Sequence, residues 1–159
     1  SQIQSERARP MITLPDPIVY YRIVWEIVRH IPAGKVSTYG HIATMIPAPA
    51  GVEAADYEKL APRWVGDAMN AVSRVDDPEI PWHRVINSKG EISLPPDSVS
   101  AALQRARLRH EGTMADDAEI VDLNQYLWEP DRNWLWEHGL RPPKSLKKQQ
   151  SHTGQMRLF

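Results

Sequence analysis

The stretch IPWHRVINSKGEIS, residues 80–93, places a tryptophan, a histidine and an arginine directly behind a proline. Its segments WHRVIN and EIS flank the turn SKG, and this order of apolar and turn residues predicts a small β hairpin. A cluster of aromatic and ionisable side chains in such a short span is typical of a functional site. Trp82, however, has no ionisable group, because its indole can only donate a hydrogen bond. The stretch therefore predicts a site in which an inert ring takes the place of a reactive side chain.

Two short helices are predicted before this stretch. Ser37 or Thr38 can cap the first helix, which Pro47 ends, and residues 61–72 form the second with apolar and small residues on one side. Residues 47–62 between them are rich in proline, alanine and acids and are expected to form a loop that can include one helical turn. The pair matches a helix-turn-helix, although its loop is longer than the usual short turn and many helical pairs bind no nucleic acid.

Further elements are predicted on both sides of these motifs. Asp16 and Pro17 signal the start of a helix whose apolar residues recur at helical spacing as far as Ile31. Residues 97–112 are predicted to form another helix, and residues 119–123 a last short strand. The expected fold class is therefore mainly α with a small β hairpin or strand element.

The composition predicts one compact domain followed by a tail. The chain has 159 residues, of which 42% are hydrophobic, and this is enough for a single core. We expect residues 1–15 to be disordered and residues 16–130 to form the domain. Residues 131–159 are a Trp-rich and basic extension that ends in the peptide QMRLF.

Several classes of protein are excluded or constrained by the composition. The chain has no cysteine, which excludes disulfides, thiolate zinc sites and thiol nucleophiles. The net charge of −1 means that nucleic-acid binding needs a local basic patch, and the stretch from residue 141 onward holds five Lys/Arg and no acid.

No apolar run approaches the roughly 20 residues that span a bilayer. We expect a soluble intracellular protein of the cytoplasm or nucleoid, with no membrane partner.

Four motifs in order carry a resemblance to a known family: GKVSTYGHIA, RWVGDAM, PWHRVINSKGEIS and LQRARLRHEG. Together they resemble the DNA-binding domain of the O6-alkylguanine-DNA alkyltransferases, a winged-helix-like helix-turn-helix domain. In that family the nucleophile lies in a Pro-Cys-His-Arg-Val motif, and Trp82 stands at the position of its cysteine. This variant is similar to the alkyltransferase-like proteins, which recognise the same lesions without repairing them. The similarity covers roughly residues 17–130.

The resemblance implies a DNA-binding function without catalysis. The protein is expected to bind O6-alkylguanine in duplex DNA by minor-groove docking and base flipping, and to mark the lesion for nucleotide excision repair. Alkyl transfer needs an ionisable nucleophile, which an indole cannot supply, so no enzyme activity and no cofactor or metal are expected. Two alternatives remain open: a lesion-processing enzyme of the glycosylase or nuclease kind that uses His83 and Glu111, and a general DNA-binding regulator.

The resemblance also assigns roles on the helix-turn-helix. Tyr39 matches the tyrosine that pushes on the target phosphate and helps to rotate the base outward. Arg63 matches the arginine that enters the duplex and fills the resulting gap, a role that suits a planar guanidinium. Val65, Gly66 and Ala68 belong to the recognition helix, where small residues allow a close approach to the minor groove.

The lesion pocket and its support are assigned in the same way. Trp82 is expected to line a pocket for the alkyl group, Val85 to offer a backbone acceptor to the guanine edge, and Ser93 to place a hydroxyl near O6. Residues 94–96 replace an arginine that related proteins hold over the flipped base. The residues expected to support the motif structurally are Ser37, His83, Arg84, Asn87 and Glu111.

The last five residues carry a separate hypothesis. QMRLF resembles the bacterial sliding-clamp peptide, in which Leu158 and Phe159 would enter an apolar pocket and Gln155 would bond at its rim. The polar linker before it suits a tethered ligand, and the alternative is a disordered tail without a partner. The expected partners are thus lesion-bearing duplex DNA, nucleotide excision repair factors and a sliding clamp, and the protein is expected to be a monomer.

Overall fold

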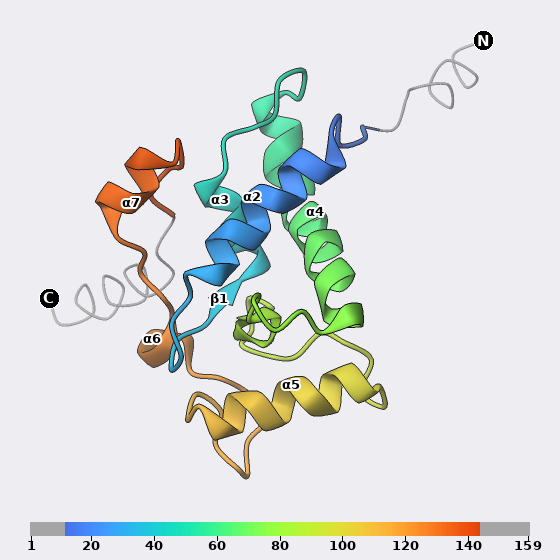
Figure 1. The fold of residues 1–159 in the computed structure, drawn as a ribbon, viewed down its shortest axis with the longest axis vertical. Helices are drawn as coiled ribbons and strands as arrows, with labels where there is room; N and C mark the ends of the chain where they lie inside the picture. Colours follow the sequence, from blue (N-terminus) through green and yellow to red (C-terminus); the bar gives the residue numbers. More distant parts are fainter. Residues whose placement is uncertain (1–11, 144–159) are drawn as a thin grey trace, which may run out of the picture.

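The computed structural model describes residues 12–143, and Figure 1 shows how its elements are arranged. They are α2 (Pro17–Arg29), β1 (Ser37–Thr38), α3 (Tyr39–Met45), α4 (Ala54–Val75), the 3₁₀ helix η1 (Trp82–Arg84), β2 (Val85–Ile86), α5 (Val99–His110), α6 (Leu123–Tyr126) and α7 (Arg132–Glu137). Helices dominate, so the predicted mainly α class is confirmed. The predicted disorder of residues 1–15 falls mostly outside the described residues, and the QMRLF peptide falls wholly outside them. Across residues 12–143, no helix has the length and apolar character needed to span a membrane.

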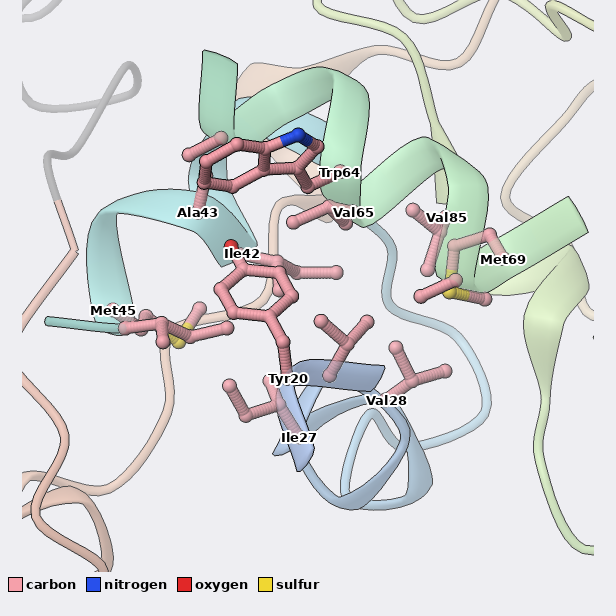
Figure 2. Packing of buried hydrophobic residues seen from close by; sticks show 14 of the residues in the cluster. Tyr20, Ile27, Val28, Ile42, Ala43, Met45, Trp64, Val65, Met69 and Val85 are labelled. Carbon is pink, nitrogen blue, oxygen red and sulfur yellow. The ribbon is translucent and has the colours of Figure 1, made fainter. Parts of the chain in front are cut away.

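The helix α2 begins where its cap signals predict it. Asp16 Oδ1 accepts a hydrogen bond from the backbone N–H of Val19 over 3.4 Å, and Pro17 occupies the first turn, where no N–H partner is required. Four residues at helical spacing form its buried face: Tyr20, Val24, Ile27 and Val28. Figure 2 shows side chains of this face meeting residues of α3 and α4 in the main core.

The second helix of the predicted helix-turn-helix is longer than the sequence suggested. The helix α4 begins at Ala54, so the prediction of a loop over residues 47–62 is wrong from residue 54 onward. The chain between α3 and α4 is therefore residues 46–53. This shorter connection removes most of the difference from the usual helix-turn-helix.

Pro62 lies inside α4, where a proline costs about 3 kcal/mol because it removes a hydrogen bond and crowds the preceding turn. The surrounding packing offsets this cost. Tyr57 and Ala61 before the proline and Trp64 after it are buried at 4%, 2% and 7% exposure, in the same core cluster. The buried face on both sides of Pro62 accounts for the continuation of α4 through the proline.

The predicted hairpin is wrong, because β2 pairs in parallel with β1 instead. Ser37 lies opposite Val85, and Thr38 lies opposite Ile86. The chain does turn back after β2, but Glu91 forms an antiparallel bridge with Ile120 rather than a ladder with β2. The sequence pattern predicted that β2 is extended. It could not identify the strand that pairs with β2, because that strand is distant in the sequence.

Gly90 is required by this turn. Its φ is +82°, and a Cβ atom at this position would lie 2.3 Å from the carbonyl oxygen of Val121. The backbone N–H of Val121 also donates to Gly90 O over 2.8 Å. The close contact brings Ile120 and Val121 against the turn that leads to Ser93. The prediction of a strand at residues 119–123 is wrong, because Ile120 forms only an isolated bridge and Leu123 begins α6.

The helix α5 and the C-terminal extension complete the structure. Ser98 Oγ caps α5 by accepting from Ala101 N over 3.1 Å. The short helix α6 precedes the extension, which forms α7, and Leu135 of α7 is 1% exposed within the main core cluster. Arg141 N then donates to Met45 O over 2.8 Å. Residues 131–141 therefore pack on the helix-turn-helix.

Candidate nucleic-acid interface

The exposed face of α4 borders a groove of about 330 Å³, which we call the α4 groove. Helix α4 contributes Pro62, Arg63, Gly66, Asp67 and Asn70 to its lining. The other lining residues are Tyr39, Ser93, Leu94 and Pro95. The groove thus joins the start of α3, one side of α4 and the loop after β2, and it includes residues from three of the four sequence motifs.

Tyr39 and Ser93 meet at this groove. Their hydroxyl oxygens are 2.9 Å apart, so the two side chains share a hydrogen bond across 54 residues of sequence. Burial raises the pKa of Tyr39, and the hydrogen bond with Ser93 offsets only part of this effect. The phenol therefore stays protonated at neutral pH and can donate a hydrogen bond.

The structure separates the predicted lesion-binding residues into two sets. Tyr39, Arg63, Gly66 and Ser93 line the α4 groove together. The other predicted contacts, Val65, Ala68, Trp82 and Val85, have between 0% and 3% of their surface exposed and are not among the lining residues.

Helical geometry explains this division on α4. Val65 and Ala68 belong to α4 as predicted, but both are 0% exposed because their side chains face the core. Asp67 and Asn70 lie four and seven residues after Arg63 and therefore share its face. The helical spacing from Arg63 was a signal that could have identified both.

Val85 is also buried, and its carbonyl already has a partner. Gln104 Nε2 donates to Val85 O over 2.9 Å and to His83 O over 3.2 Å. Gln104 is 2% exposed, so its amide is committed to holding the backbone of this motif. No pattern in the sequence marked Gln104 for this task, because its partners lie about 20 residues away in the chain.

Trp82 takes part in a cluster on another side of the motif. Its indole N–H donates to Asp76 Oδ1 over 2.9 Å, and the guanidinium carbon of Arg107 lies 5.6 Å from the ring centroid. Arg107 binds both carboxylate oxygens of Asp76, at 2.7 and 2.8 Å. The hydrogen bonds from Arg107 and then from Trp82 lower the pKa of Asp76 to about 2. The carboxylate therefore stays ionised at neutral pH.

His83, Arg84 and Glu111 form a second polar group. Arg84 donates to Glu111 Oε2 over 2.6 Å and to Ile31 O over 2.8 Å, and it thereby joins η1 to the end of α5 and to the residues after α2. His83 Nε2 lies 3.1 Å from Glu111 Oε2, but the ring is poorly aligned and neither ring nitrogen makes a directed hydrogen bond.

The ionisation of this group follows from its burial. Burial lowers the pKa of His83 and outweighs the nearby carboxylate, so the ring is neutral at pH 7. Burial opposes the ionisation of Glu111, but the bonds from Arg84 and the contact with His83 outweigh it and lower its pKa. The result is a neutral imidazole beside a paired carboxylate.

Asn87 and Ser37 hold the backbone around the site. Asn87 Oδ1 accepts from the N–H groups of Lys89 and Glu91, both at 2.9 Å, and this braces the turn after β2. Ser37 Oγ lies 2.6 Å from Nδ1 of His41, and both side chains are buried. Within residues 12–143, no group of three or more His, Asp or Glu side chains is placed to hold a metal ion.

The fold and the groove together define a helix-turn-helix DNA-binding domain. Residues 19–113 match the family described as the DNA-binding domain of 6-O-methylguanine DNA methyltransferase. The chain belongs to this family.

Relatives of known identity are similar over most of the described residues. The chain is 36% identical over 115 residues to alkyltransferase-like protein 1 of Schizosaccharomyces pombe, a match that covers 70% of this chain and 95% of that protein. It is 35% identical over 105 residues to the DNA base-flipping protein of Escherichia coli K12, which covers 66% and 70% of the two chains. The crystal structure of S. pombe Atl1 with damaged DNA containing O6-carboxymethylguanine matches with 34% identity and a TM-score of 0.52, over 75% of this chain and 100% of that one.

The buried His41 gives the domain a defined pH dependence. Burial lowers the pKa of His41 to about 4, whereas an imidazole in the unfolded chain titrates near 6.5. Between these values the unfolded chain binds a proton that the folded protein excludes, so stability falls as the pH drops below about 6.5. The variant His41→Gln keeps a polar partner for Ser37 and cannot titrate. From pH 7.5 to 5.5, urea unfolding should show that the native chain loses about 1 kcal/mol more than this variant. Equal losses would contradict the assignment.

Proposed function

We propose that this protein binds O6-alkylguanine lesions in duplex DNA without transferring the alkyl group. In this proposal α4 lies along the minor groove, and the damaged base is rotated out of the duplex into the α4 groove. The observation that carries the proposal is the joining of Arg63, Gly66, Tyr39 and Ser93 in that one groove. The similarity to a protein solved with DNA containing O6-carboxymethylguanine supports the choice of lesion.

Arg63 and Tyr39 are well placed for base flipping. Arg63 projects from an exposed position on α4, from which a planar guanidinium can enter the duplex and stack where the base has left. Tyr39 lies across the groove, and its phenol can press on the backbone of the target nucleotide. Flipping costs a few kcal/mol and less for a damaged or mispaired base, which favours the lesion.

The glycine at position 66 suits the close approach of DNA and is not required by the packing of the protein itself. A Cβ atom at this position would meet nothing within 4 Å, so the fold itself does not require glycine there. Glycine inside a helix is less stable than alanine by about 1 kcal/mol. A DNA backbone that approaches α4 closely would account for a glycine at this position.

The absence of transfer follows from the chemistry of the chain. The sequence contains no cysteine, and the indole of Trp82 has no anionic form that could attack an alkyl carbon at neutral pH. The alternative enzyme built on His83 and Glu111 is disfavoured by their surroundings. The ring of His83 is buried, the carboxylate of Glu111 is paired with Arg84, and neither residue is among those that line the α4 groove.

We further propose that the bound complex marks the lesion for nucleotide excision repair, as the family resemblance implies. Clamp binding through Gln155, Leu158 and Phe159 stays a prediction, because these residues lie outside the described part of the chain. Either partner would act on a protein that holds the lesion and leaves it chemically unchanged.

Lesion preference is the first test. Fluorescence anisotropy with matched duplexes, carrying guanine or O6-methylguanine at one position, should show tighter binding to the lesion at two salt concentrations. Arg63→Ala should reduce this preference roughly 10-fold, or about 1.4 kcal/mol, because the orphaned base pair loses its stacking partner. Tyr39→Phe should reduce it several-fold, because the phosphate and Ser93 lose the hydroxyl.

The matched control is Arg132→Ala, which removes the same charge from the exposed surface of α7. It should lower affinity for both duplexes alike and leave the preference intact. Equal affinity of the native protein for both duplexes would instead favour the general DNA-binding regulator.

Gly66→Ala separates binding from folding. The variant should be more stable by up to about 1 kcal/mol, because alanine favours the helix. It should also bind DNA several-fold more weakly, because the new methyl group stands where the DNA backbone approaches. Urea unfolding and anisotropy measure the two effects on one sample. A gain in stability with unchanged affinity would show that DNA does not approach α4 at this residue.

The fate of the lesion tests the absence of chemistry. After incubation of the protein with an oligonucleotide that carries O6-methylguanine, mass spectrometry should show an unchanged protein mass and unchanged DNA. A methyl group on the protein would reveal transfer. A lost base or a cut strand would favour the enzyme built on His83 and Glu111.

A further inference from the structure

Trp82 is held by two partners, Asp76, which lies outside the sequence motifs, and Arg107, to which the motifs assign no role. Its ring is 3% exposed, its N–H is bonded to Asp76, and its face is covered by the guanidinium of Arg107. A cation within about 6 Å of an indole face is attracted by the ring quadrupole. The polar edge and one face of this tryptophan are therefore already occupied within the protein.

Asp76 occupies a position that usually belongs to glycine. It ends α4 with a left-handed backbone (φ +51°), and it is the only non-glycine residue with positive φ among residues 12–143. A left-handed conformation costs an ordinary side chain on the order of 1–2 kcal/mol, less for Asp and Asn. The three hydrogen bonds that its carboxylate accepts from Trp82 and Arg107 give a reason for an aspartate at this helix end.

Arg107 connects this helix end to the rest of the site through α5. Gln104 lies one turn before Arg107 on α5 and holds the carbonyls of His83 and Val85. The chain then runs through the turn after β2 to Ser93, whose hydroxyl meets Tyr39 at the α4 groove. In Figure 1 the end of α4 lies above α5, which is consistent with this route.

These contacts form a path of hydrogen bonds and chain segments that leads from the end of α4 to the α4 groove. The path links the end of α4 to α5, α5 to the backbone of the motif, and the motif to the start of α3. We propose that Trp82, Asp76 and Arg107 form a latch that fixes the angle of α4 against the α4 groove, and that Trp82 is a positioning residue for lesion discrimination rather than a wall for the alkyl group. This proposal rests on the lesion-binding function proposed above.

Because α4 is long, a small change in its angle displaces Arg63. Arg63 lies 13 residues before Asp76 on the same helix, which is about 20 Å at 1.5 Å per residue. A tilt of about 5° at the latched end therefore moves Arg63 by roughly 2 Å. Binding groups must be held to within about 0.5 Å to act together, so a released latch would separate Arg63 from its place in the duplex.

The test measures the ratio of affinities for lesion-bearing and undamaged duplex in variants of the latch. Trp82→Phe keeps an apolar ring and loses the N–H donor. Asp76→Gly removes the carboxylate and suits the left-handed backbone, so the end of α4 is retained. Each variant should lower the ratio about 5-fold, and the double variant should lower it no further, because both changes open one latch.

Two adducts distinguish the latch from a wall. A tilted α4 weakens the binding of every lesion alike, so O6-methylguanine and O6-benzylguanine should show the same fold loss. If Trp82 were instead a wall of the alkyl pocket, Trp82→Phe should weaken the binding of O6-benzylguanine more than that of O6-methylguanine. A loss in Trp82→Phe that grows with adduct size, with Asp76→Gly behaving like the native protein, would overturn the latch and favour the wall.

Two controls distinguish the effect of opening the latch from the loss of a positive charge and from unfolding. Arg105→Gln removes a cation from the same helix, where Arg105 pairs with Glu119 rather than with the latch, and it should leave the ratio unchanged. Circular dichroism confirms that each variant is folded, and Asp76→Asn replaces Asp76→Gly if the latter is not. Unchanged ratios in both latch variants would overturn the proposal. Equal affinity of the native protein for both duplexes would overturn the lesion-binding function and the latch together.

Discussion

The burial of three aromatic rings at the start of α4 is the constraint on which the placement of the site depends. Tyr20 of α2 lies edge-on to Tyr57 and Trp64, with ring centroids 6.2 and 6.1 Å away. The hydroxyls of Tyr20 and Tyr57 are 2.8 Å apart, and Tyr57 donates onward to Ala43 O over 3.3 Å, so three helices share one hydrogen-bonded chain. Because this packing buries the inner face of α4 on both sides of Pro62, the helix continues through the proline and presents its exposed face beside Tyr39.

Two polar side chains that do not line the α4 groove hold the backbone of the motif in place. Gln104 secures the carbonyls on either side of Arg84, and Arg84 itself joins η1 to Ile31 and Glu111. Buried polar groups of this kind stabilise a structure only when they are satisfied, since an unpaired buried group costs about 1–3 kcal/mol. The two ring nitrogens of His83 are the exception among the described side chains, and they lie in the motif that family relatives use for chemistry.

A division of tasks follows from this arrangement. The exposed face of α4 and the Tyr39–Ser93 pair are accessible to DNA, whereas the tryptophan, the histidine and the glutamate of the motif are mostly buried behind them. Such a domain can recognise a lesion through shape and hydrogen bonds while it offers no nucleophile. In the function proposed above, the lesion is retained and the product is a complex that other factors can find.

The sequence by itself determined the class of fold, the family and the residues at the α4 groove that carry a motif, because caps, helical spacing and four ordered motifs are local signals. It could not determine that Pro62 lies within a helix or that β2 pairs in parallel with β1. These features depend on which distant surfaces meet. The partnership of Trp82 with Asp76 and Arg107 was decided by the tertiary structure alone, since Asp76 and Arg107 are 31 residues apart and only folding brings their charges together.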